Sequence, residues 1–160
     1  MLSQGIFGLS AAFGLIAWAL VARHFVWPAL RERSQADALR PLLILHSFRF
    51  LGLSFLVPGV VSPALPSAFA VPAAVGDFGA MLLALIALGA LRSSLGIPVV
   101  WLFNIWGTAD LLYAFFNGNQ VGLDFGHLGA AFYIPTVVVP LLLVTHVLVF
   151  RILLRPMTNR

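Results

Sequence analysis

Residues 45–52 read LHSFRFLG, an apolar run that contains the imidazole of His46 and the guanidinium of Arg49. The run lies within a longer segment, about Pro41–Val61, that is apolar enough to cross a bilayer. A charged side chain near the middle of a membrane helix costs roughly 2.5–3.5 kcal/mol on insertion scales, so it usually faces a partner or water. We therefore expect the other helices to supply partners for both side chains.

The composition predicts an integral membrane protein. The chain has 160 residues, of which 61% are hydrophobic and only 9% charged, and a soluble domain of this size could not solvate that much apolar surface. It contains no Cys, which excludes disulfides, iron–sulfur clusters, thiol nucleophiles and thiolate zinc sites. All nine basic residues are Arg, which excludes a lysine nucleophile and a Schiff-base chromophore.

Five apolar runs predict a single all-α domain, residues 1–160, built as a bundle of five transmembrane helices. Each run has about the 20 residues needed to cross the hydrocarbon core. The predicted spans are about Ile6–Trp27, Pro41–Val61, Val71–Leu91, Ile97–Asn117 and Leu128–Leu154.

The arginines indicate the orientation of the bundle. With the N-terminus outside, the segment 31–40, the turn at Arg92 and the C-terminal arginines all fall on the cytoplasmic side. No positively charged region precedes the first apolar run, so that run is typical of a spanning helix and not of a cleaved signal peptide. We expect a multi-pass protein of the bacterial cytoplasmic (inner) membrane. The net charge of +4 does not indicate nucleic-acid binding, because the arginines form no basic stripe.

His46 and His146 are expected at the same depth in two different helices. His46 follows Arg40 by six residues and His146 precedes Arg151 by five, or roughly 9 and 8 Å at 1.5 Å per residue. Two facing imidazoles are the ligands that a low-spin haem b requires. The pair is therefore a candidate metal and cofactor site, with Arg49 as the partner of a haem propionate. The alternative is that the two histidines only form interhelical hydrogen bonds.

A second polar cluster is expected in the outer half of the bundle, from Asp77, Asp110 and Tyr133. The predicted ligand pocket also includes Asn104, Trp106 and Tyr113. Trp106, Asp110 and Tyr113 follow helical spacing, which places an aromatic stripe with one carboxylate on one face. Such a cluster could bind a cation, relay a proton or hold a polar head group. The alternative is a packing role, in which Asp110 bonds Tyr133 or Asn104 across helices, or pairs with Arg49 near the middle of the membrane.

Three functions follow from these sites. The first is a haem b protein exchanging electrons with a quinone. The second is a binder or transporter of a small solute, ion or lipid that uses Arg49, Asp77 and Asp110. The third is an accessory subunit of a membrane complex. Small residues at helical spacing in the first span (Gly5, Gly8) and the third (Gly76, Ala80, Ala84) offer surfaces for a homo-oligomer or a partner subunit. Catalysis does not follow from the sequence.

Overall fold

The computed structural model describes residues 2–155 and shows an all-α protein with six helices. Short π-helical and 3-10 segments join some of them, giving five continuous helical units long and apolar enough to cross a membrane. These units are Leu2–Arg31, Gln35–Leu56, Ser67–Ala90, Gly96–Gln120 and Ile134–Leu153. The predicted all-α class and the predicted number of spans are therefore confirmed, as expected for a multi-pass membrane protein.

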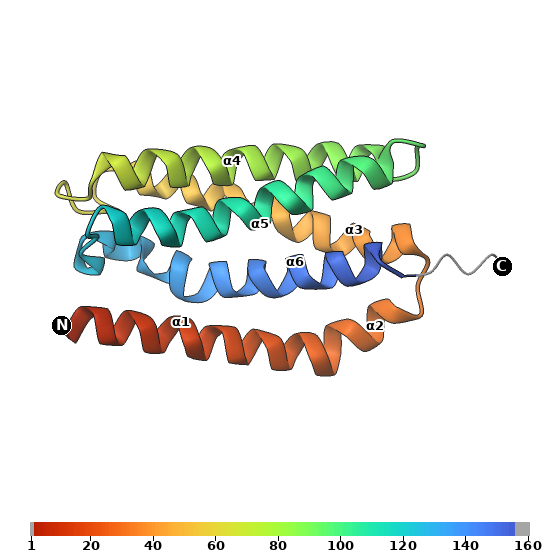
Figure 1. Ribbon diagram of the computed structural model, residues 1–160, viewed down its shortest axis with the longest axis horizontal. Coiled ribbons are helices and arrows are strands. Elements are labelled where there is room, and N and C mark those ends of the chain that lie inside the picture. The colour runs from red at the N-terminus through yellow and green to blue at the C-terminus, as the bar shows by residue number, and fades with distance from the viewer. Residues whose placement is uncertain (1, 156–160) are drawn as a thin grey trace.

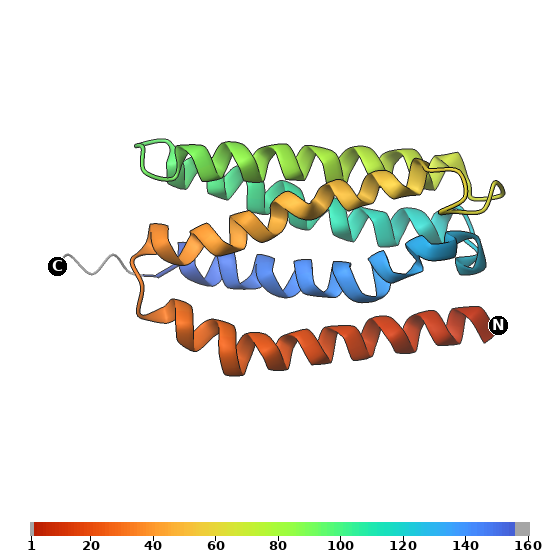
Figure 2. The same ribbon diagram turned by 180° about the vertical axis from the view of Figure 1, so that it is seen from behind.

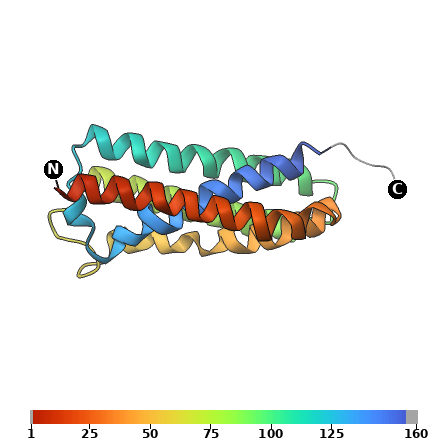
Figure 3. The ribbon, with the colours of Figure 1, turned by 90° about the horizontal axis from the view of Figure 1, so that it is seen from below.

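The five units run lengthwise beside one another, so that the two ends of the bundle carry the loops (Figures 1 and 2). Helices α4 (Ser67–Ala90) and α5 (Gly96–Gln120) pack along each other, and α4 also packs against the second unit. Helix α6 (Val139–Leu153) contacts α1, α3 and α5, whereas α1 (Leu2–Val21) contacts mainly the fifth unit and lies over it when seen from below (Figure 3). The fifth unit is thus the centre of the bundle.

The first unit is longer than predicted at both ends. After α1 it continues through a π-helical turn, η1 (Ala22–Val26), into the short helix α2 (Trp27–Arg31). Pro28 follows this turn, and a second π-helical turn, η4 (Ile134–Val138), precedes Pro140 in the same way. A proline ring clashes with the carbonyl four residues earlier in a regular α-helix, so a widened turn before each proline relieves that contact.

The second unit begins six residues before the predicted start at Pro41. Helix α3 (Gln35–His46) starts earlier because Ser34 caps it, its hydroxyl accepting from the Asp37 amide at 3.2 Å. The unit then continues as a 3-10 helix of ten residues, η2 (Ser47–Leu56), and ends before the predicted boundary at Val61. The buried residues of η2 recur every third position, as expected for three residues per turn; they are Arg49, Gly52 and Phe55.

The fifth unit begins later than predicted, at Ile134 in place of Leu128. Residues 125–132 form a separate 3-10 segment, η3 (Phe125–Phe132), which is interrupted at Gly129. Gly129 has a φ of 53°, a left-handed conformation that glycine adopts without a steric penalty. This break lies inside η3, so the residues from Leu128 onward do not form one regular helix with the fifth unit.

The predicted small-residue faces have different outcomes. Gly76, Ala80 and Ala84 are all buried inside the bundle, so this small-residue face of α4 packs within the chain and is not exposed to a partner. Gly5 and Gly8 lie exposed with nothing near them, so they pack against no other helix of the described chain, and the oligomer surface expected there stays a prediction. The close approach of α1 occurs instead at Gly14, where a Cβ atom would overlap the carbonyl oxygen of Thr136.

Candidate functional site

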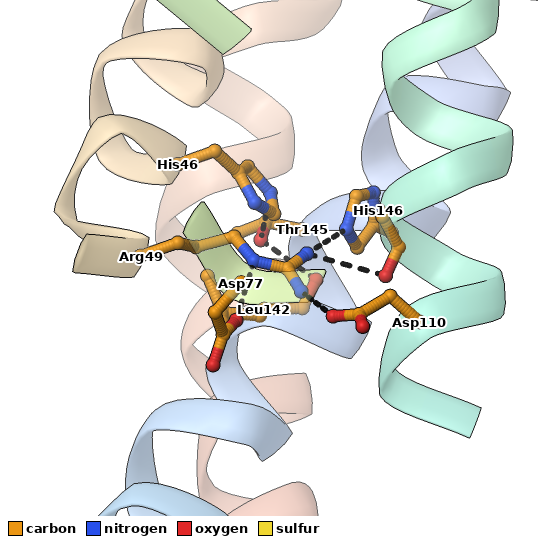
Figure 4. A network of polar contacts seen from close by, with 8 residues as sticks. His46, Arg49, Asp77, Asp110, Leu142, Thr145 and His146 are labelled. Carbon is orange, nitrogen blue, oxygen red and sulfur yellow. Dashed lines mark hydrogen bonds and ion pairs between the residues drawn. The ribbon is translucent and has the colours of Figure 1, made fainter. Parts of the chain in front are cut away.

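Arg49 lies at the centre of a buried ion-pair network. Its side chain has no solvent exposure, and it binds two carboxylates from neighbouring helices (Figure 4). Nε donates to Oδ1 of Asp77 on α4 at 2.8 Å, and Nη2 donates to Oδ2 of Asp110 on α5 at 2.5 Å. The guanidinium therefore links η2 to α4 and to α5 by charge-assisted hydrogen bonds.

The third nitrogen of the guanidinium is also bound. Nη1 of Arg49 donates to the carbonyl oxygen of Gly107 and lies 3.2 Å from Nε2 of His146 on α6. Arginine presents donors in a fixed fork and cannot accept, so Nε2 of His146 must be the acceptor. Arg49 thus has partners on three helices, as the cost of burying its charge requires.

Asn104 fixes the protonation of His146. Nδ1 of His146 lies 2.6 Å from Oδ1 of Asn104, and Nδ2 of Asn104 donates to the backbone carbonyl of His146 at 3.2 Å. The second bond orients the amide, so its oxygen faces the imidazole and Nδ1 carries the hydrogen. Together with the arginine at Nε2, this makes His146 a neutral imidazole protonated at Nδ1.

The rings of His46 and His146 lie at the same level, with centroids 4.2 Å apart and planes inclined by 46°. Nε2 of His46 is 3.0 Å from the hydroxyl of Thr145, and Phe103 packs against both rings. Nδ1 of His46 is buried and has no hydrogen-bond partner among the described residues. The expected meeting of the two imidazoles therefore occurs, and aromatic packing surrounds it.

The histidine pair does not fit a haem in this arrangement. Two imidazoles that ligate one iron must lie on opposite faces of a porphyrin, with a bond of about 2 Å on each side, as for metal–imidazole bonds generally. Rings in contact at 4.2 Å leave no room for a porphyrin between them, and Nε2 of each ring already has a partner. Nor do the described residues contain a group of three or more His, Cys, Asp or Glu placed to hold a metal ion.

Three glycines make room for the network. A Cβ atom on Gly52 would overlap the Asp77 carboxylate, and one on Gly76 would overlap that of Asp110. A Cβ on Gly107 would lie 2.6 Å from Cε1 of His146 and 2.9 Å from Nη1 of Arg49. Because real Cβ contacts are longer than this, each position requires glycine for the polar side chain to stay where it is. Nothing in the sequence marks Gly52 or Gly107 as a site residue.

A cavity of about 250 Å³ lies beside the network, toward the end of the bundle that carries η3. We call it the aromatic cavity, because five phenylalanines contribute to its wall: Phe7, Phe55, Phe69, Phe115 and Phe125. Asp77 and Asp110 also line it, whereas Arg49 does not. The remaining oxygen of each carboxylate, Oδ2 of Asp77 and Oδ1 of Asp110, has no hydrogen bond to the described residues.

The charges of the network do not cancel when both carboxylates are ionised. One guanidinium then faces Asp77 and Asp110, and His146 is neutral, which leaves one excess negative charge. Isolated charge is costly in a medium of low dielectric constant, so a cation or a proton bound at the carboxylates would restore the balance.

Three predicted pocket residues lie elsewhere. Trp106 and Tyr113 on α5 are 51% and 52% exposed, and Tyr133 is 66% exposed, so none of them lines the aromatic cavity. Asn104, also predicted for the pocket, is buried outside the aromatic cavity, where it bonds His146 and not Asp110. Of the alternatives for Asp110, the one that occurs is the pairing with Arg49.

The chain belongs to a protein family described as Domain of unknown function (DUF8737), which residues 6–154 match. No curated protein and no solved structure matches the chain. The family's shared segment contains the complete network and the whole lining of the aromatic cavity.

Proposed function

We propose that this member of the family binds a small, mostly apolar molecule with a positively charged head group in the aromatic cavity. The observation that carries the proposal is that Asp77 and Asp110 both line a cavity whose other lining residues, apart from Asn119, are apolar. A pocket with a few convergent polar groups on an apolar lining is the usual form of a ligand site.

The charge of the network supports a cationic head group. Arg49 neutralises one carboxylate, so an ammonium group at the free oxygens would balance the second. The cavity wall also contains five phenylalanines, and the face of an aromatic ring attracts a cation. A quinone head group, which only accepts hydrogen bonds, is not complementary to these carboxylates, whereas a hydroxyl donor would be.

The volume of the cavity limits the size of the ligand. An engineered cavity of about 150 Å³ accommodates benzene, so a space of about 250 Å³ suits a molecule only moderately larger. The cavity lining includes Gly118 and Leu123 near the α5–η3 connection, which is the proposed route of entry.

We also propose the orientation and location of the bundle. The end that carries α2 and the α4–α5 turn, and at which α6 ends, holds most of the described arginines, so by the positive-inside rule it faces the cytoplasm. The aromatic cavity then opens toward the outer half of a bacterial inner membrane. A binding protein in this orientation would receive its ligand from outside.

A thermal-shift series on the purified protein in detergent tests the binding proposal. The probes are butylammonium, butanol and butyrate, which share a body and differ in head group. We expect butylammonium to raise the midpoint of unfolding and butyrate not to, with the neutral alcohol between them. Asp110→Asn should abolish the effect of butylammonium, because it removes the excess charge and keeps an acceptor for Arg49.

Tyr113→Phe serves as the matched control, because Tyr113 lies on the same helix less than one turn away and faces outward. It should leave the response to butylammonium unchanged. Equal responses to all three probes, or a response that survives Asp110→Asn, would contradict the proposal.

A further inference from the structure

A second groove lies between α1 and α6 at the opposite end of the bundle from the aromatic cavity. Its apolar part is formed by small and aliphatic side chains, and Arg23, Trp27 and Arg151 lie at its charged end. The apolar residues are Ala19 and Ala22 from the first unit and Val144, Val147 and Leu148 from α6. The groove thus has an apolar floor at membrane depth and a cationic end near the helix termini.

The cationic end has little compensating negative charge. Arg151 and Arg155 both stack on the ring of Trp27, with guanidinium carbons 3.8 and 4.6 Å from its centroid. Neither they nor Arg23 forms an ion pair with a described carboxylate. Glu32, whose negative charge acts on Arg155, already pairs with Arg31 at 2.9 Å.

Arg155 is held in place by the fold. Nη1 of Arg155 donates to the carbonyl oxygens of Leu30 and Arg31 at the end of α2, which ties the C-terminal end of α6 to the first unit. Burial, followed by the positive charge of Arg151, lowers the pKa of the Arg155 guanidinium, while Glu32 opposes that shift. A bound anion would reduce the electrostatic repulsion between these neighbouring positive charges.

From this arrangement we infer that the groove between α1 and α6 binds an anionic phospholipid, with an acyl chain along Ala19, Val144 and Val147 and the phosphate at Arg23 and Arg151. Basic pockets between membrane helices recognise anionic head groups by charge and hydrogen bonding. An apolar floor leading away from the charge favours a lipid over a soluble phosphate, because only the lipid fills both parts. The inference is independent of the ligand proposed for the aromatic cavity.

Native mass spectrometry of the protein from micelles with equal amounts of phosphatidylglycerol and phosphatidylcholine tests this inference. The wild-type protein should retain phosphatidylglycerol preferentially. Arg151→Gln and Arg23→Gln should each reduce this preference about fivefold, the effect of one basic residue near an anionic lipid surface. Glycerol 3-phosphate, which lacks acyl chains, should not displace the lipid.

Two further variants separate the groove from general surface charge. Arg92→Gln removes an exposed arginine in the turn between α4 and α5 and should leave the lipid preference unchanged. Val147→Trp fills the groove without changing charge and should reduce retention of phosphatidylglycerol. A wild-type protein that retains both lipids equally, or an Arg92→Gln effect as large as that of Arg151→Gln, would overturn the inference. Circular dichroism of each variant in phosphatidylcholine micelles checks folding.

Discussion

Asn104 and His146 form a reciprocal pair in which the imidazole Nδ1 donates to the amide oxygen and the amide nitrogen donates to the histidine's own carbonyl. The pair links α5 to α6 and leaves Nε2 of His146 free to accept from Arg49. The two hydrogen bonds between Asn104 and His146 therefore keep Nε2 of His146 unprotonated, so that it can accept from Arg49.

Replacing Asn104 with Leu should destabilise the protein by about 1–3 kcal/mol, because Nδ1 of His146 loses its acceptor while buried. Equilibrium unfolding in mixed micelles measures the change. Thr108→Ala is the control, since the Thr108 hydroxyl bonds only the Asn104 carbonyl within its own helix, and the substitution should cost much less. Equal losses for the two variants would refute the reciprocal pair.

Removing Arg49 should have a larger effect, because two buried carboxylates lose their counter-charge. For Arg49→Met we expect a loss of about 3–5 kcal/mol in the free energy of unfolding. The triple variant that adds Asp77→Asn and Asp110→Asn should recover a large part of this loss, because no uncompensated charge remains. A triple variant less stable than Arg49→Met alone would show that charge is not the cause.

Two glycine substitutions, one at the network and one away from it, should change the stability of the protein in opposite directions. Gly107→Ala should destabilise the protein by about 1–3 kcal/mol, since the new methyl would press on His146 and Arg49. Gly89→Ala, at a helical position with nothing near it, should stabilise it by up to about 1 kcal/mol through helix propensity. Thermal unfolding of both variants in one detergent compares them directly, and the same sign for both would be inconsistent with the close packing described.

The absorption spectrum tests the haem prediction. Because the two imidazoles are in contact with each other, we expect purified protein to show no Soret band, with or without added haem. A low-spin haem spectrum that disappears in both His46→Ala and His146→Ala would show that the two helices separate to admit a porphyrin.

The spans could be predicted from the sequence because each is a long apolar run, and the level of the two histidines followed from counting residues inward from the arginines. The ends of the second span could not be found in this way. Ser34 and Asp37 form a helix cap in a polar stretch, so the helix extends beyond the apolar run that marks it.

The direction in which a side chain points was harder to predict. In α5 every face is rich in apolar residues, so the period of 3.6 does not show which one is buried. The buried side follows Phe103, Gly107 and Leu111, which leaves Trp106 and Tyr113 facing outward and Asp110 at the edge between the two sides. The glycines at the network gave no signal, because a glycine in a membrane helix usually reports helix packing and not space for a polar group.

The 3-10 geometry of η2 determines what the second span presents to the rest of the bundle. From Arg49 to Phe55 is two complete turns of a 3-10 helix, so the arginine of the network and the phenylalanine of the cavity wall share one edge. An α-helix advances about 100° per residue and would rotate the second of these residues roughly a third of a turn away, into lipid. An insertion of one residue within 50–54 would therefore separate the ion pairs from the aromatic cavity while leaving the hydropathy profile almost unchanged.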